Sequence, residues 1–174
     1  QALIKLGYDN VLDDYVSTSS IDKIISLNIG NSNITDLTGL EDFSALTTLY
    51  CQDNQLTILD VSQNTALTKL KCGFNQLTSL DVTKNTALIE LLLWSNELTS
   101  LDISKNTELT HLDCHSNQLA NLDISKNTVL TNLYCYDKKL TSLDVSQNTA
   151  LTNLDCGYNS LTSLDVTKNT ALDT

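Results

Sequence analysis

Hydrophobic positions recur along this chain with two nested periods. From Leu46 the pattern Leu-x-x-Leu-x-Cys is followed ten residues later by Leu-x-x-Leu-x-Val, and this pair of half-units repeats every 21 residues. In both halves apolar and polar residues alternate, which predicts short β-strands with one apolar face. Each half ends at an Asn, a residue typical of turns. The pattern therefore predicts a coil with two strand-like sides in every unit.

The repeated units predict a solenoid. They begin at Leu46, Leu67, Leu88, Leu109, Leu130 and Leu151, and a divergent unit of 22 residues precedes them. A short strand needs a pairing partner, and the same segment one unit later is the partner offered to every strand. We expect parallel, in-register strands in a gently curved coil over residues 24–174, whose last unit is cut within a repeat. Residues 1–23 lack the pattern, and we expect a truncated N-terminal cap with a short helix there.

Cysteine occupies one slot of the repeat. The cysteines are Cys51, Cys72, Cys114, Cys135 and Cys156, and Leu93 and Ile29 fill the same slot in the other units. A slot that exchanges Cys for Leu is a volume-filling position of the core. Parallel neighbours also hold their Cβ atoms about 4.8 Å apart, beyond the usual disulfide geometry. We expect buried, reduced thiols that bind no metal.

The repeat motif resembles a known family. LxxLxCxxNxLTxLDVSxN is similar to the 21-residue bacterial class of leucine-rich repeats called IRREKO, and ITDLTGLEDFSALTTL resembles an internalin-type repeat. The resemblance implies a right-handed solenoid in a secreted or surface-exposed bacterial protein. It also implies binding through side chains that project from the LxL/LxC strands. Lys138 departs from the motif, because it replaces the Asn of the turn in its coil.

Asparagine forms two columns in this arrangement. One column contains Asn54, Asn75, Asn96, Asn117 and Asn159, and the other contains Asn64, Asn85, Asn106, Asn127, Asn148 and Asn169. A buried turn must pair its backbone N–H and C=O groups, and an inward amide can do so. We expect both columns to be structural.

Aspartate forms a row of its own, at Asp60, Asp81, Asp102, Asp123, Asp144 and Asp165. Neighbouring carboxylates about 5 Å apart repel each other by about 0.8 kcal/mol in water. Bound Ca²⁺ could neutralise such a row. Turn capping and the lysines three positions on, such as Lys84, offer a local alternative. The sequence favours the local alternative and leaves calcium open.

Charge and composition exclude several classes of function. Acidic residues number 21 and basic residues 10, all of them Lys, which gives a net charge of -11. Such a chain repels nucleic acid and anionic membranes. No apolar run approaches the roughly 18 residues that membrane insertion requires. We find no catalytic motif, and an open solenoid face lacks an enclosed pocket, so we expect neither an enzyme nor a cofactor.

The outward positions beside the strand Leu residues change from unit to unit, whereas those of the second side are nearly constant. The variable face is where we expect a partner to bind. Its candidate residues are Tyr50, Lys71, Glu90, Leu92, Trp94, His111, Asp113, His115, Tyr134 and Tyr136. Aromatic side chains there suit a protein hot spot or the stacking of a sugar ring. Cross-strand packing on a solvated sheet is the alternative.

His111, Asp113 and His115 have the composition of a metal site. Residues four apart on one strand are about 13 Å apart, so the two histidines cannot share an ion. We expect ordinary polar contacts for both.

Together these features predict a non-enzymatic binding module of a bacterial surface or secreted protein, which mediates protein–protein interaction or adhesion. A glycan-binding module and a structural spacer for other domains remain alternatives. Ice binding is disfavoured, because rows such as Thr57, Thr78 and Thr99 lack an outward Thr-x-Thr pair. We expect a monomer, or weak end-to-end association through unpaired strand edges.

Overall fold

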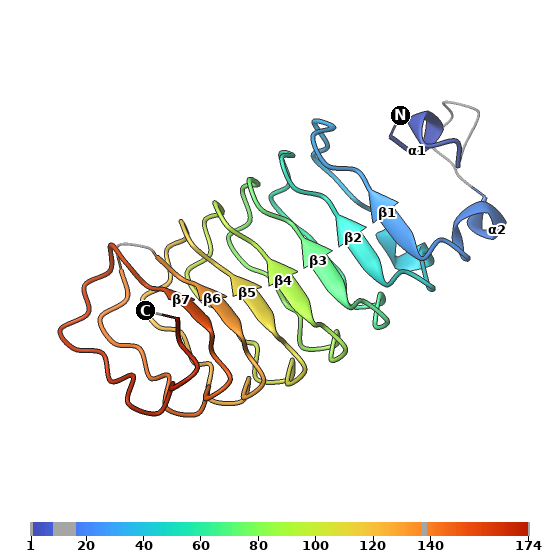
Figure 1. The fold of residues 1–174 in the computed structure, drawn as a ribbon. Coiled ribbons are helices and arrows are strands. Elements are labelled where there is room, and N and C mark those ends of the chain that lie inside the picture. The colour runs from blue at the N-terminus through green and yellow to red at the C-terminus, as the bar shows by residue number, and fades with distance from the viewer. Residues whose placement is uncertain (1, 9–16, 137–138, 174) are drawn as a thin grey trace.

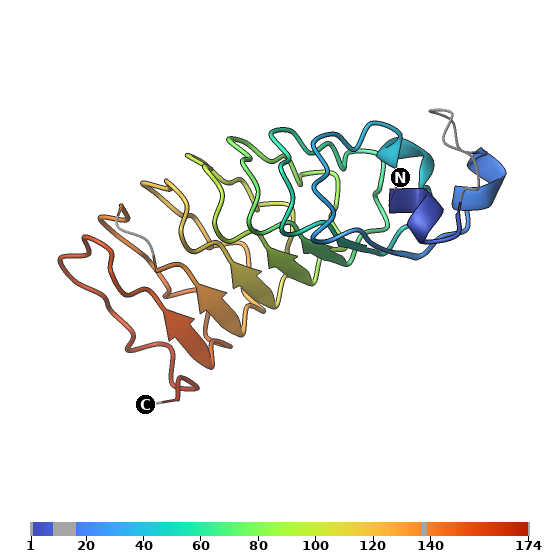
Figure 2. The same cartoon turned by 90° about the horizontal axis from the view of Figure 1, so that it is seen from above.

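The chain forms a solenoid with a single parallel sheet along one side (Figure 1). The computed structural model describes residues 2–8, 17–136 and 139–173. Within these ranges, seven strands pair in chain order. They are β1 (Ser26–Asn28), β2 (Thr48–Tyr50), β3 (Lys69–Lys71), β4 (Glu90–Leu92), β5 (His111–Asp113), β6 (Asn132–Tyr134) and β7 (Asn153–Asp155). Seen from above, the strands follow one another along the same side of the coil (Figure 2).

The register of the sheet agrees with the repeat. Leu49 of β2 pairs with Leu70 of β3, and Leu91 of β4 pairs with Leu112 of β5. Every step of one repeat therefore places equivalent residues side by side, as predicted. These central Leu residues are fully buried from β2 to β6, and their burial provides the main drive for stacking the coils.

The cysteine slot is part of the same core. Cys51, Cys72, Cys114 and Cys135 are buried together with Leu93, while Cys156 in the last coil is half-buried. Burial raises the pKa of the Cys51 thiol to about 12, because a thiolate would lose its hydration there. The slot is a core position, as the exchange of Cys for Leu predicted.

The second side of the coil differs from the expectation. In the described residues it contains no paired strand, because backbone N–H groups at its turns bond within their own turn. The N–H of Ser62 donates to the Asp60 carboxylate at 2.8 Å, and the N–H of Asn64 donates to the Val61 carbonyl at 3.0 Å. These local bonds compete with a ladder to the next coil. The LDV segments alternate like strands but end as capped turns.

Both asparagine columns point inward, as predicted. In the first column, the Asn75 amide donates to the carbonyls of Cys72 and Cys51, and its Oδ1 accepts the N–H of Leu56 at 3.0 Å. In the second column, the Asn85 amide donates to the carbonyls of Val61 and Asn64 at 2.9 Å. Each amide thus ties its own coil to the preceding one.

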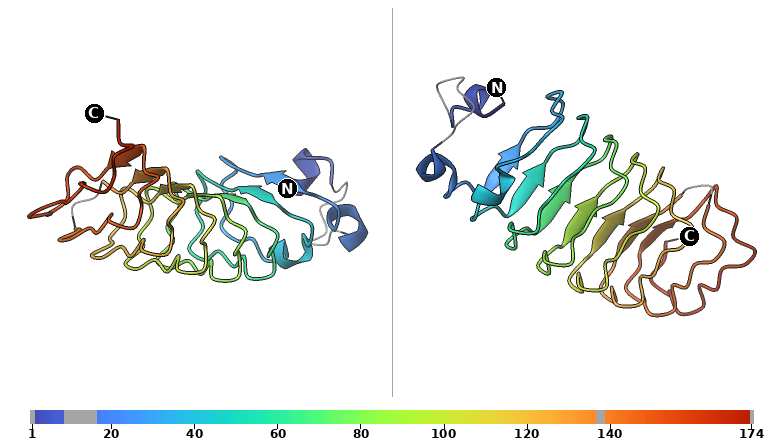
Figure 3. Two further views of the ribbon diagram at one scale, coloured as in Figure 1. Left: turned by 60° about the horizontal axis from the view of Figure 1, so that its bottom comes forward. Right: turned by 180° about the vertical axis from the view of Figure 1, so that it is seen from behind.

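Short helices lie at the N-terminal end. They are α1 (Ala2–Lys5) and α2 (Thr18–Ile21), and a 3₁₀ turn, η1 (Leu40–Asp42), follows β1. Ile21 is buried and Leu3 packs against the same core. Figure 3 shows these helices and the C-terminus at opposite ends of the solenoid. The boundary between residues 1–23 and 24–174 stays a prediction. Lys138, which replaces the Asn of the turn in its coil, lies outside the described residues.

Candidate functional site

The predicted binding residues lie on the outer surface of the sheet. We call this surface the strand face, and it comprises the two outward residues of each strand from β2 to β7 together with the residue that follows the cysteine slot. One column of it contains Tyr50, Lys71, Leu92, Asp113, Tyr134 and Asp155, which pair in register. Glu90 and His111 are neighbours in the adjacent column. The alternation that buries each central Leu exposes these side chains.

Trp94, His115 and Tyr136 form a stacked column beside the strands. The rings of Trp94 and His115 are 6.3 Å apart between centroids, with 9° between their planes. The rings of His115 and Tyr136 are 4.2 Å apart and inclined by 17°. The three rings therefore follow one another along the axis of the solenoid, with the indole on one side of the imidazole and the phenol on the other.

The N-terminal end of this column is closed. Gly73 is buried under the indole of Trp94, since a Cβ atom there would lie 2.5 Å from the ring. The Lys71 ammonium lies 5.2 Å from the centroid of the same ring, which is a cation–π distance. Phe74 meets the indole edge-on at 6.2 Å. Neighbours on several sides thus fix the position of Trp94.

Asp113 orients the central ring. Its Oδ1 accepts a hydrogen bond from His115 Nδ1 and a second from the backbone N–H of His115 at 3.3 Å. A carboxylate only accepts hydrogen bonds, so Nδ1 carries the hydrogen. Burial, together with the nearby carboxylates of Asp113 and Asp155, raises the pKa of the Tyr136 hydroxyl. The phenol therefore stays neutral well into the alkaline range.

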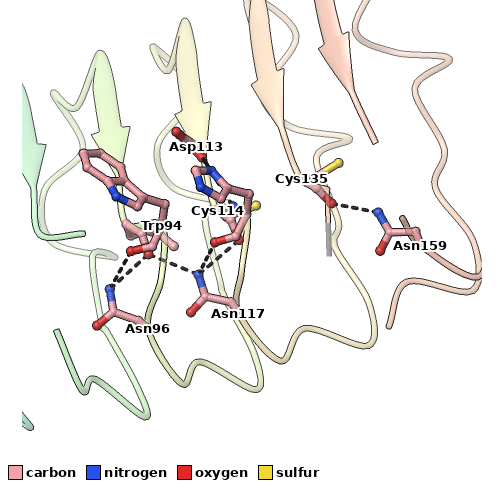
Figure 4. A network of polar contacts seen from close by, with 9 residues as sticks. Trp94, Asn96, Asp113, Cys114, Asn117, Cys135 and Asn159 are labelled. Carbon is pink, nitrogen blue, oxygen red and sulfur yellow. Dashed lines mark hydrogen bonds and ion pairs between the residues drawn. The ribbon is translucent and has the colours of Figure 1, made fainter. Parts of the chain in front are cut away.

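Figure 4 shows how the turn below these rings is held. Asn96 donates to the carbonyls of Leu93 and Trp94 at 3.0 and 3.4 Å. Asn117 makes the equivalent bonds to Cys114 and His115 at 3.1 and 3.2 Å. The inward amides thus hold the backbone from which the side chains of Trp94 and His115 project.

The candidate metal trio does not converge. His111 contacts the hydroxyl of Thr110 at 2.8 Å, while His115 turns to Asp113 and the stacked rings. Among the described residues, no group of three or more His, Cys, Asp or Glu side chains could hold a metal ion. His111 and His115 make ordinary polar contacts, in agreement with the strand spacing.

The Asp row caps the turns of the other side. Each carboxylate accepts the N–H of the residue two positions on, at 2.8 to 2.9 Å. The hydrogen bond from the Ser62 backbone is the main reason that the pKa of Asp60 falls below its usual value, and repulsion from Asp81 opposes it less strongly. Local hydrogen bonding therefore outweighs repulsion along the row.

Comparison with known proteins places this solenoid among bacterial repeat proteins. No family model matches the chain. Over 62 residues it is 47% identical to Internalin J of Listeria monocytogenes. The matched segment covers 36% of this chain and 7% of that protein. The solved functional domain of Internalin J, described as including a cysteine ladder, superposes with a TM-score of 0.89 and 48% identity over 91% of this chain. The chain is a leucine-rich-repeat protein with internalin-like repeats.

A more distant internalin shares only the fold. The structure of an L. monocytogenes internalin (inlF) has a TM-score of 0.73 at 20% identity, covering 99% of this chain and 59% of its own. The internalin-like chain spans 35% of the solved Internalin J domain and a still smaller share of the whole protein. Within the described residues, no helix has the length and apolar character needed to cross a membrane.

Some residues of the site were not predicted from the sequence of this internalin-like chain. Phe74 occupies a turn position with a positive φ of 50° and is 54% exposed, yet it packs against Trp94. Lys69 forms an ion pair with Glu90 at 3.5 Å. The indole of Trp94 packs over Gly73, which has no side chain in the way. A Gly–Phe pair one unit before a lone Trp was the available signal.

Proposed function

We propose that this internalin-like domain is a non-enzymatic binding module of a secreted or cell-surface protein, and that it recognises a partner protein through the strand face. The contact centre is the stacked column of Trp94, His115 and Tyr136, with Leu92 and Tyr134 beside it. The remaining predicted residues, Tyr50, Lys71, Glu90, His111 and Asp113, surround this centre.

The stacked column is the observation that carries the proposal. Its rings are held by Gly73, Lys71 and Asp113 before any ligand arrives. A rigid aromatic side chain loses little conformational entropy on binding, and such residues dominate protein interfaces. A column that served only to pack a solvated sheet would not need neighbours on so many sides.

The arrangement favours protein over glycan. Sugar rings stack on the flat faces of aromatic side chains, and the His115 ring has the nearly parallel rings of Trp94 and Tyr136 on its two sides. The indole of Trp94 is likewise covered by Lys71, Gly73 and Phe74. These neighbours leave less room on the flat faces of Trp94 and His115 for a sugar ring.

The test is a binding comparison of three forms of the chain. The wild type, a Trp94→Ala, Tyr136→Ala double variant and a Ser100→Ala, Ser142→Ala control are immobilised and exposed to extracellular proteins and to a glycan array. The control residues are exposed and lie on the turn side. Circular dichroism and thermal unfolding first establish that all three are folded.

We expect one protein to bind the wild type and the control, with affinity for the double variant lower by at least about tenfold. A glycan that shows this same pattern would replace the protein in the proposal. Equal binding to all three forms would overturn the strand face as the site and favour a spacer role.

A further inference from the structure

The two ends of the aromatic column are unequal. At the N-terminal end, the Lys71 ammonium lies over the indole of Trp94. At the other end, the Tyr136 ring stacks on His115 with one face, and within the described residues no ring or cation is recorded against its second face. The next coil carries Gly157 at this level, so it supplies no side chain to continue the stack.

The space beside Tyr136 is a notch with a carboxylate at its base. A Cβ atom built on Gly157 would meet only Asp155 Oδ1, at 3.4 Å, and no atom of Tyr136 within 4 Å. The same Asp155 oxygen accepts the N–H of Gly157 at 3.1 Å, which holds the carboxylate in the notch. Gly157 and Asp155 are both exposed, so the notch is open to solvent.

We propose that this notch, bounded by the second face of the Tyr136 ring, the backbone of Gly157 and the carboxylate of Asp155, binds the guanidinium group of an arginine side chain on the partner protein. The inference rests on the proposed function, because it names the chemistry of that partner at one position of the strand face.

Charge and shape both select arginine. The neighbouring rings are inclined by only 9° and 17°, so a flat guanidinium continues the column as its next member. Asp155 accepts only a backbone N–H, from Gly157, among the hydrogen bonds of the described residues, so it can also accept from the guanidinium, whereas Asp113 accepts both the backbone N–H and the imidazole of His115. The chain contains no Arg, and its net charge of -11 favours a cationic partner. Lys71 over Trp94 provides the internal example of a cation on this column.

The test is an NMR titration of the full chain with Nα-acetyl-arginine amide at neutral pH. The citrulline and lysine analogues serve as the neutral and the non-planar comparison. We expect saturable shifts of the Gly157 amide and Tyr136 ring signals with arginine, weaker binding of lysine and none of citrulline.

Variants locate the site. Asp155→Asn and Tyr136→Leu should each weaken arginine binding by at least about threefold. A matched control should not: Asp144→Asn removes the same charge from the turn side of the solenoid. Equal binding of citrulline or lysine, or unchanged affinity in either site variant, would overturn the proposal.

These outcomes separate the two proposals. If the strand face captures a protein but the arginine probe does not bind, the notch is wrong and the proposed function stands. If the probe binds but protein capture ignores Trp94 and Tyr136, the notch stands and the proposed function fails.

Discussion

The strand side and the turn side of this solenoid use the same alternating pattern for different purposes. On the strand side, backbone groups bond to the neighbouring coils, as when the N–H of Cys72 donates to the Leu92 carbonyl at 2.8 Å. On the turn side, an outward Asp must accept an N–H of its own coil, as Asp81 does from Thr83 at 2.9 Å. Side chains vary where the backbone does not need them, and this leaves the side chains of the strand face free to differ from coil to coil.

The capping bond of the turn side also occurs at some positions of the strand side. Asp113 and Asp155 on the strand side also accept the N–H two residues on, from His115 and Gly157. Tyr50 and Leu92 occupy the same column and cannot do so. The strand side therefore tolerates the capping bond without depending on it, because the sheet already fixes the backbone.

The largest expected effect follows from removing an inward amide on the turn side. Asn106→Ala should lower the free energy of unfolding by about 2 to 3 kcal/mol, because the buried carbonyls of Val82 and Asn85 each lose the hydrogen bond from the next coil and keep only the one within their own turn. Urea denaturation measures this, with the exposed Asn121→Ala as the matched control in the next coil. Equal stability of the two variants would show that the coils do not depend on this column.

The second largest effect is expected from alkaline pH, which should lower the stability of the folded state through the buried cysteines. Burial raises the pKa of Cys51 from 9.0 in the unfolded chain to about 12, so the folded state binds the proton more tightly. The resulting stability is complete below pH 9 and is lost as the pH rises towards 12. The melting temperature measured between pH 8 and 11 should fall less steeply in Cys51→Val than in the wild type. Parallel curves would contradict this.

A smaller effect, of opposite pH dependence, is expected from the Asp row. The backbone N–H of Ser104 keeps the pKa of Asp102 below 3.8, so its stabilisation is present above that pH and is lost on further acidification. Asp102→Ala should lower the melting temperature at pH 7, and the difference from wild type should vanish near pH 2. Ser100→Ala in the same turn serves as control, and a difference that persisted in acid would exclude the proton-linked bond.

The smallest effect should come from the strand face itself. Tyr134 is exposed and no backbone group depends on its side chain, so Tyr134→Ser should change the free energy of unfolding by no more than about 0.5 kcal/mol. Guanidinium unfolding measures the change. A loss as large as that of Asn106→Ala would mean that the strand face is shaped by packing and is not free to vary.

Much of the architecture could be predicted from the sequence, because a strict repeat leaves one register. Leu49 must meet Leu70 once the units stack, and the Cys51 slot must be apolar because Leu93 also fills it. The turn side was harder, since LDV segments alternate like strands while the capping bond of Asp60 decides the outcome.

The candidate site could be predicted only as a set of positions. The repeat places Trp94, His115 and Tyr136 in one column, but the direction in which each ring leans depends on contacts between coils. His115 is oriented by Asp113, and the indole leans towards the space that Gly73 leaves. Phe74 lies in a left-handed turn position, where alternation does not indicate an outward side chain.

The packing of the Trp94 indole over Gly73 also affects which repeat units of such a gene can be exchanged. Nearly identical frames invite the loss, gain or exchange of whole units by recombination. The unit that begins at Leu88, however, follows a unit with glycine in that slot, and a side chain there would displace the indole. A recombinant that placed a larger residue in the slot would therefore have to repack the aromatic column at this junction.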